Sequence, residues 1–216
     1  MTDLQSQGFS VIDGPFSADD VSAVSSGYDE IFASLPEARI KRGSTSIRFG
    51  GLTEWQWFLP IILYPPLLAL AQRYIGDPFK LSSFYGRTLL PTTTAPPLHQ
   101  DVKPGSDGDP LMGFIYMVDP FTVTNGATRF APGSKNLAQL PDDSPEYRAC
   151  GPAGSLLIFD GATWHEHGAN QTPATRRSIQ GYFIRQDHTA AVRWADEIPE
   201  SQARHLPPRA RDVLVI

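Results

Sequence analysis

Residues 154–185 decide the fold, and they read GSLLIFDGATWHEHGANQTPATRRSIQGYFIR. Two stretches within them, 155–159 and 178–184, are short, rich in β-favouring residues and bounded by Gly, Pro, Asn or Asp. This pattern predicts two strands, with a turn at Asp160-Gly161 after the first. A histidine-rich segment lies between the strands, so the chain delivers metal-binding side chains directly after a strand and a turn.

Further short strands are predicted on the N-terminal side of this segment. Residues 81–85, 111–118 and 127–131 have the same character, and Asn125-Gly126 is a hairpin-type turn signal. Many short strands without helices between them favour a β-sandwich or a small barrel. The 20 prolines and 18 glycines exceed the roughly 12 % that the two make up in an average protein, as frequent turns require.

The first third of the chain has a helical pattern instead. Residues 8–12 predict an edge strand, after which Ser17 and Asp20 form a capping box at the start of an amphipathic helix. A second helix is predicted between Pro65-Pro66 and Gly76. The basic stretch 39–48, RIKRGSTSIR, is interpreted as a solvated loop, with the rim of an anionic-substrate site as the alternative.

The predicted organisation is therefore one domain over 1–216, mainly β with N-terminal helices. A mostly helical part, 1–78, packs on a β core at 79–185, and 186–216 form a C-terminal tail. The length of 216 residues agrees with one domain.

Composition excludes several classes of protein. A single cysteine excludes an intrachain disulfide and a cysteine-rich zinc or iron–sulfur site. The formal net charge of −5 disfavours a nucleic-acid partner. The most apolar stretch, 59–71, is interrupted by prolines and is shorter than the roughly 20 residues that span a bilayer. We expect a protein without membrane contact, in the cytoplasm.

Candidate metal ligands lie in two motifs. His99 and Asp101, in PLHQD, are two residues apart and share one face of an extended chain. The segment after 154–161 offers His165 and His167 as a third ligand, and strand parity does not choose between them. Two histidines and a carboxylate are the facial triad of non-haem Fe(II) oxygenases, which leaves coordination positions open.

A candidate carboxylate site follows on the last strand. Arg176 and Ser178 share a face, and a guanidinium beside a hydroxyl can hold a carboxylate such as that of 2-oxoglutarate. Arg177 points to the opposite face, where solvent exposure or a surface ion pair is the expected state.

These motifs, together with GFSVIDGPFSADDV near the start and NGATRFAPGSKN in the middle, resemble the phytanoyl-CoA dioxygenase (PhyH) family. The resemblance implies a double-stranded β-helix core (jelly roll, cupin-like) and the cofactors Fe(II), 2-oxoglutarate and O2. In this family the distal histidine precedes the 2-oxoglutarate arginine by eleven residues, with an asparagine five residues after the histidine. The resemblance therefore selects His165 with Asn170 and Arg176. It leaves His167 either behind a metal ligand or on the substrate side, and makes His167 and Asn170 candidate substrate contacts.

The implied activity is hydroxylation of an unactivated C–H bond of a small organic molecule, with release of succinate and CO2. Asp101 stands where related halogenases have Gly or Ala, so hydroxylation is favoured over halogenation. Desaturation, epoxidation and cyclisation remain open, as does the oligomeric state. The negative net charge disfavours an acyl-CoA substrate.

Two parts of the site lack an assignment from the family pattern. An ungapped count places Gly113 where a relative has a serine that binds 2-oxoglutarate, so Thr88 and Arg87 are the candidates for the C1 end. Trp194, in the tail, is a candidate substrate contact if the tail folds over the barrel mouth.

The competing hypothesis is a non-catalytic or non-oxygenase cupin-like metal protein. Cupins carry paired histidines close in sequence, whereas the first motif here has one histidine and an aspartate. A binding module also has no need of Arg176 at the family spacing.

Overall fold

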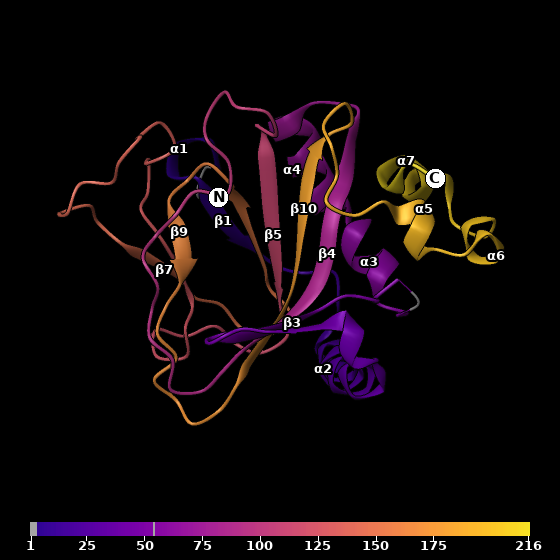
Figure 1. Cartoon of the computed structure of the whole chain (residues 1–216), viewed down its shortest axis with the longest axis horizontal. Helices are drawn as coiled ribbons and strands as arrows, with labels where there is room; N and C mark the ends of the chain where they lie inside the picture. The colour runs from indigo at the N-terminus through magenta and orange to yellow at the C-terminus, as the bar shows by residue number, and fades with distance from the viewer. Residues whose placement is uncertain (1–3, 54) are drawn as a thin grey trace.

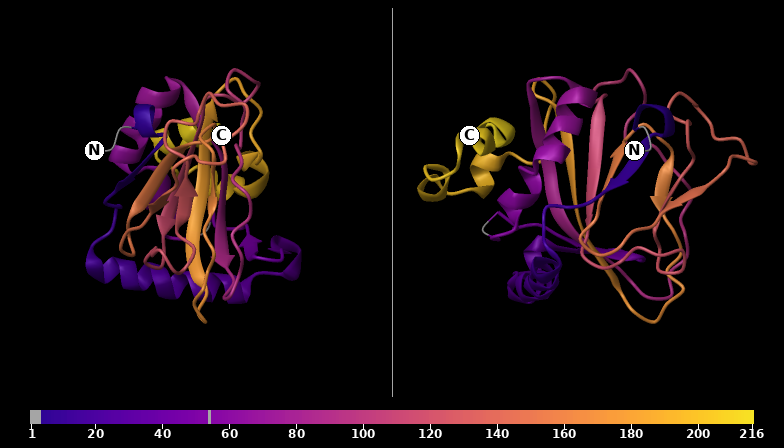
Figure 2. Two further views of the ribbon diagram at one scale, coloured as in Figure 1. Left: turned by 90° about the vertical axis from the view of Figure 1, so that its left-hand side faces the viewer. Right: turned by 180° about the vertical axis from the view of Figure 1, so that it is seen from behind.

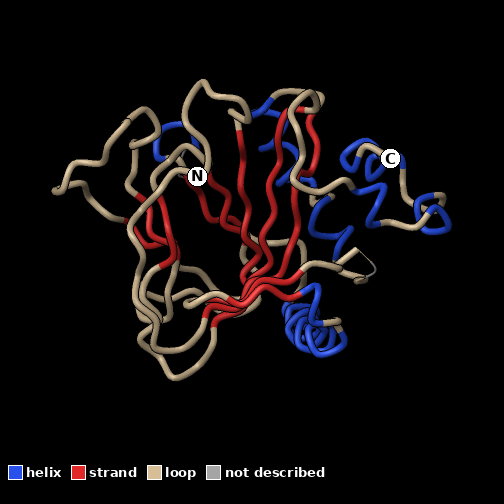
Figure 3. The backbone as a smooth tube through the Cα atoms, viewed as in Figure 1, coloured by secondary structure: helices blue, strands red, loops and turns tan. Residues whose placement is uncertain are grey.

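Two antiparallel sheets form the body of the protein (Figures 1 and 3). The computed structural model describes residues 4–53 and 55–216. The large sheet has seven strands in the order β1-β8-β5-β10-β4-β3-β2, and the small sheet has the order β7-β6-β9. The strands are β1 (Phe9–Ile12), β2 (Ile40–Arg42), β3 (Ser46–Phe49), β4 (Phe79–Leu89), β5 (Leu111–Met117), β6 (Thr128–Phe130), β7 (Tyr147–Ala149), β8 (Leu156–Asp160), β9 (His165–His167) and β10 (Arg176–Arg185).

The strand order is that of a jelly roll. β10 lies between β4 and β5 in the large sheet, and β8 follows on the other side of β5. Isolated bridges join Thr93 to Asn170 and His99 to His165, so the segment before the first ligand motif runs beside β9 as a fourth, weakly paired strand. The chain thus alternates between the two sheets, and the barrel interior lies between them.

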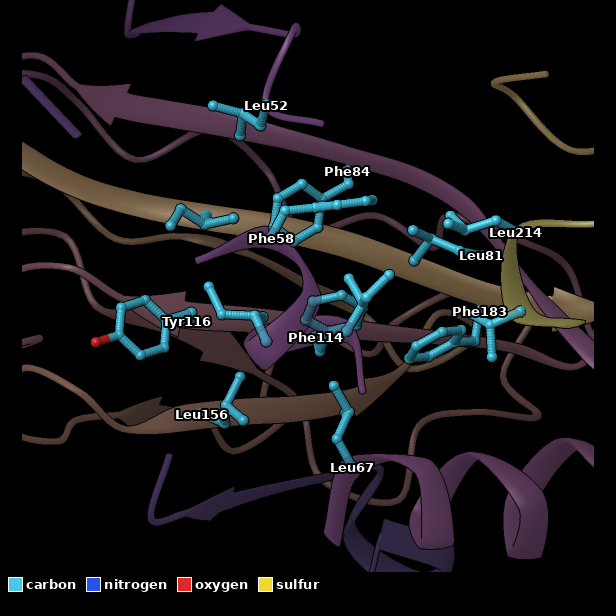
Figure 4. Close-up of a cluster of buried hydrophobic side chains, with 14 of the residues drawn as sticks. Leu52, Phe58, Leu67, Leu81, Phe84, Phe114, Tyr116, Leu156, Phe183 and Leu214 are labelled. Atoms are coloured by element: carbon cyan, nitrogen blue, oxygen red, sulfur yellow. The ribbon is translucent and has the colours of Figure 1, made fainter. Parts of the chain in front are cut away.

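Most helices lie on the outer side of the large sheet, away from the small sheet (Figure 2). They are α2 (Ala18–Ser34), α3 (Phe58–Ile62), α4 (Pro65–Ile75), α5 (Trp194–Glu197), α6 (Glu200–Ala203) and α7 (Pro208–Leu214), with the 3-10 turn η1 (Glu37–Arg39). The short helix α1 (Leu4–Gln7) lies beside β1 and β8 instead. A continuous apolar cluster fills the space between helices and sheet, with Phe58, Phe84, Phe114 and Phe183 among its members (Figure 4). This cluster buries one face of the sheet and leaves the other face for the site.

The predicted helices lie where the sequence pattern placed them. Ser17 caps α2 by accepting a hydrogen bond from the backbone N–H of Asp20, and α4 begins at Pro65 and ends before Gly76. The interpretation of 39–48 as a solvated loop is wrong, because β2 and β3 form a hairpin there that extends the large sheet beyond β4. Edge strands with many polar side chains lack the apolar alternation that reveals a strand.

The tail after β10 packs on the helical side of the large sheet (Figure 2). Its helices α5 and α7 contribute Trp194, Val213 and Leu214 to the apolar cluster. Within the described residues, no helix combines the length and apolar character needed to cross a membrane.

Phe183 tests the role of this cluster. Its ring lies 5.4 Å from that of Phe79 and 5.2 Å from that of Phe114, and it is fully buried. We expect Phe183→Ala to lower the free energy of unfolding by about 3–5 kcal/mol, through lost burial and a cavity, in urea denaturation followed by circular dichroism. Val123→Ala is the control because Val123 is 57 % exposed. Equal losses in the two variants would contradict this assignment.

Candidate active site

Three side chains with metal-binding atoms meet inside the barrel mouth. One ligand atom each of His99, Asp101 and His165 lie within 4.8 Å of one another. The Asp101 carboxylate is 3.3 Å from Nε2 of His99 and 3.4 Å from Nε2 of His165. Imidazole and carboxylate ligands with a convergent geometry suit a divalent metal such as Fe(II).

Backbone hydrogen bonds hold the two ligand segments together. His99 and His165 each donate a backbone N–H to the other's carbonyl, at 3.1 and 2.9 Å. The N–H of Asp101 donates to the carbonyl of Gly161 at 2.8 Å, which fastens the first motif to the turn after β8. The two motifs, far apart in sequence, are therefore fixed at neighbouring positions.

The His165 ring is oriented by its surroundings. Its Nδ1 lies 2.7 Å from the carbonyl oxygen of Thr163, and its ring packs against those of Phe130 and Phe159. A carbonyl can only accept, so Nδ1 donates to Thr163, and Nε2 is the ring nitrogen that faces Asp101 and is available to a metal.

Asp101 is held in its ionised form. Burial opposes ionisation, but the hydrogen bonds with His165 and His99 outweigh it and hold the carboxyl pKa well below its usual range. The same hydrogen bond raises the pKa of His99, against the effect of partial burial. In the metal-free protein His99 therefore stays protonated up to a higher pH than an isolated histidine does.

Arg176 is buried on the same side of the large sheet as the cluster of His99, Asp101 and His165. The cluster and Arg176 line one cavity of about 180 Å³. The residue is 1 % exposed, and its guanidinium stacks 3.9 Å above the Phe121 ring. Nη2 donates to the Gly126 carbonyl, whereas Nε and Nη1 have no hydrogen-bond partner among the described residues. Burial, with Arg87 nearby, lowers the pKa of Arg176 to about 9. A buried cation with donors to spare is a binding site for an anion.

The neighbouring positions divide between the two faces of the sheet. Ser178 and its partner Arg87 share the cavity side with Arg176, but the Ser178 hydroxyl donates to the Arg87 carbonyl at 3.2 Å. Thr88 pairs with Arg177 on the helical side, where its hydroxyl lies 3.0 Å from that of Tyr28. The position of Thr88 is inconsistent with the predicted contact to 2-oxoglutarate, because the sheet separates it from the cavity.

Arg177 has the predicted ion pairs. Its guanidinium contacts the carboxylates of Asp119, at 2.6 Å, and Asp29, at 2.7 Å. The hydrogen bonds to Asp119 stabilise the charged form and raise its pKa.

The three candidate substrate contacts have different positions. His167 lines the cavity, where burial lowers its pKa and its Nδ1 lies 2.8 Å from the Gly168 carbonyl. Asn170 is buried, and its amide donates to the carbonyls of Leu90 and Ala174, which closes the loop before β10. Trp194 donates to the Leu81 carbonyl on the helical side. The latter two positions are inconsistent with substrate contact.

Several cavity residues were not predicted from the sequence. Glu166 lies 3.4 Å from Nδ1 of His99 and 3.8 Å from Arg87. Tyr85 donates to the Gln180 amide oxygen at 2.8 Å, and both line the cavity. The pairing register of β4 and β10 would have indicated this contact, because Tyr85 and Gln180 are directly paired across the two strands.

Comparison with known proteins agrees with this geometry. A family model for phytanoyl-CoA dioxygenase (PhyH) matches residues 4–178, most of the chain.

The chain belongs to the PhyH family.

Enzymes of this family use Fe(II), 2-oxoglutarate and O2, so the predicted family and its cofactor set are confirmed. Among curated relatives, dioxygenase af480 of Aspergillus fumigatus is 26 % identical over 166 residues, covering 72 % of this chain and 54 % of the relative. Dioxygenase andF of Emericella variicolor is 26 % identical, with 71 % and 59 % covered. This PhyH chain thus spans little more than half the length of these relatives.

Solved structures share the fold, which confirms the predicted jelly-roll core. The epimerase SnoN from nogalamycin biosynthesis has a TM-score of 0.71 at 19 % identity, covering 94 % of this chain and 90 % of SnoN. HygX from Streptomyces hygroscopicus, with nickel, 2-oxoglutarate and hygromycin B bound, has a TM-score of 0.69 at 16 % identity, covering 87 % and 86 %.

The raised pKa of His99 predicts how the metal affinity of the site depends on pH. A metal must displace the proton on His99. As the pH is lowered below the pKa of a histidine ligand, the Co(II) affinity therefore falls about tenfold per pH unit for each histidine that has to be deprotonated. For His99 the fall begins above pH 6.5, because its pKa is raised, and Asp101 adds nothing since it stays ionised. Co(II) absorption titrations between pH 8 and 5.5 measure this, with His205→Gln as the control. Affinity that is flat down to pH 6 would contradict it.

Proposed function

We propose that this chain is an Fe(II)- and 2-oxoglutarate-dependent dioxygenase that hydroxylates a C–H bond of a small organic molecule. The observation that carries the proposal is Arg176, a buried guanidinium with unpartnered donors in the same cavity as the His99, Asp101 and His165 cluster. A metal site needs no such cation, whereas a site for a dicarboxylate bound at its other end to a metal does.

The proposed roles follow from donor chemistry. His99, Asp101 and His165 would hold Fe(II), which together with 2-oxoglutarate and O2 supplies oxidation of a C–H bond with release of succinate and CO2. Arg176 would pair with the far carboxylate of 2-oxoglutarate, and Phe121 shields that pair from water. Arg87 is the remaining candidate for the C1 carboxylate, because it lines the cavity.

The cavity also controls what the reacting centre meets. Tyr182 lines it beside Asp101 and Tyr85, and burial keeps its pKa well above the usual value, so its hydroxyl stays protonated. Phe159 and Ile115 supply apolar walls. Apolar walls and fixed donors around an oxidising centre limit its side reactions.

The alternative reaction outcomes use the same residues. SnoN is described as a non-heme alpha ketoglutarate dependent epimerase, which shows that this fold supports reactions besides hydroxylation. Hydroxylation is proposed because Asp101 occupies the position that halogenases leave to chloride. A non-catalytic cupin-like metal protein would leave the charge of Arg176 without a partner.

The test of the whole proposal is the visible charge-transfer band of the Fe(II)·2-oxoglutarate chelate. We expect the band on anaerobic mixing of protein, Fe(II) and 2-oxoglutarate, and succinate release after O2 is added with a metabolite library. Asp101→Ala should abolish both, because it removes the charged ligand. Folded wild-type protein without a band would refute the oxygenase, and an unchanged band in Asp101→Ala would remove this residue from the site.

The proposed role of Arg176 predicts a separate effect, on the affinity for 2-oxoglutarate. Arg176→Met keeps the apolar stem but removes the guanidinium, and should weaken 2-oxoglutarate binding tenfold to about a hundredfold, as loss of a charge-assisted pair does. The readout is titration of the charge-transfer band. Arg177→Met is the matched control, since it removes the same charge one residue away on the opposite face. A larger effect in the control would contradict the assignment.

A further inference from the structure

Three cations form a row across the hairpin that extends the large sheet. In the strand register Lys41 of β2 lies opposite Arg48 of β3, and Arg48 lies opposite Arg87 of β4. Residues paired directly across antiparallel strands share one face, here the face that carries the cavity. Like charges at such positions repel one another, so the row lowers stability unless an anion joins it.

The row is poorly neutralised by the protein itself. Arg48 stacks 5.7 Å from the Tyr85 ring, and within the described ranges neither Arg48 nor Lys41 has a carboxylate partner within 4.0 Å. Among the carboxylates that the structure describes, Arg87 has a single long contact, of 3.8 Å to Glu166, and its Nε donates to the Ser46 hydroxyl. On the same hairpin, Arg42 by contrast forms a close ion pair with Glu37.

The row also lies where two hollows meet. The 180 Å³ cavity that holds the metal cluster and a groove of about 370 Å³ that opens to the surface are both lined by Arg48 and Tyr85. Lys41 lines the groove, and Arg87 lines the cavity. A molecule that enters along the groove toward the metal therefore passes Lys41 and then Arg48.

This place is separate from Arg176, which is proposed to pair with the far carboxylate of 2-oxoglutarate. Arg176 lies on β10, and Arg48 lies two strands away on β3, across β4. Neighbouring strands are about 4.8 Å apart, so the two guanidinium-bearing backbones are roughly 10 Å apart. Arg48 is also the more exposed side chain, while Arg176 is buried.

We propose that Arg48 and Lys41 form an anion-binding subsite for the substrate, which carries a carboxylate or a phosphate or sulfate ester. The anionic group binds at the junction of groove and cavity and directs the rest of the molecule toward the metal cluster. This inference rests on the proposed function, because it names the substrate class of that same site.

The test uses protein loaded with Ni(II) and 2-oxoglutarate, so that the metal and Arg176 are occupied and no turnover occurs. Calorimetric titration compares matched probes: benzoate, 3-phenylpropionate and decanoate against their amides, and phenyl phosphate and phenyl sulfate against phenol. We expect at least one anion to bind about tenfold or more tightly than its neutral counterpart. The carboxylate and ester arms identify which anionic group the subsite takes.

Variants identify the residues responsible for the preference for an anion over its neutral counterpart. Arg48→Gln should remove most of this preference, and Arg48→Lys should restore part of it. Arg42→Gln, which removes the same charge from the other face of the hairpin, should leave it unchanged. Absence of any charge preference in the wild type, or an equal loss in Arg48→Gln and Arg42→Gln, would overturn the inference.

The Fe(II)·2-oxoglutarate band separates the two possible failures. It should form in the wild type, Arg48→Gln and Arg42→Gln, because none of these changes touches the metal ligands or Arg176. A band without a charge preference would leave the oxygenase standing and remove the subsite. Absence of a band in the wild type would remove the proposed function itself.

Discussion

Two reciprocal backbone hydrogen bonds between His99 and His165 hold the site together. They make an isolated bridge rather than a long ladder, so the segment carrying the first two ligands is attached to the small sheet at few points. The bond from Asp101 to the Gly161 carbonyl adds a third point. A metal site requires its side chains to be placed within a fraction of an ångström. These three backbone hydrogen bonds fix the positions of His99, Asp101 and His165 more closely than a loop without them would.

The two adjacent arginines of β10 show what separates a structural charge from a binding charge. Arg177 faces the helices and is neutralised by Asp119 and Asp29. Arg176 faces the barrel, where Phe121 and the Gly126 carbonyl are its contacts. Burying a cation without a counterion costs several kcal/mol, and a protein that only needed stability would replace it with an apolar residue. The anionic ligand proposed for Arg176 would offset this cost, because it would pair with the donors that have no partner among the described residues.

The resemblance to the PhyH family predicts the jelly-roll core. Spacing and strand parity predict the two long helices, and they select the two histidine motifs and Arg176 as candidates that the structure brings into one cavity. They failed where the answer depends on register between strands. Thr88 and Arg87 are adjacent and equally polar, and only their pairing with Arg177 and Ser178 shows that one faces the helices and the other the cavity. The hairpin at 39–48 was missed because its strands are short and polar. Trp194 was misplaced because its partners lie more than a hundred residues away, at Leu81.

The division between the two faces of the large sheet also explains how the protein tolerates so much charge near the site. The outer face is covered by helices and packed with aromatic side chains, which provides a large apolar burial. The inner face can then carry Arg48, Arg87 and Arg176, although their mutual repulsion and burial oppose folding. Positive charge on the inner face is a stability cost that the proposed anionic cosubstrate and substrate would relieve on binding. Ligand binding and folding would thereby be coupled through the same side chains.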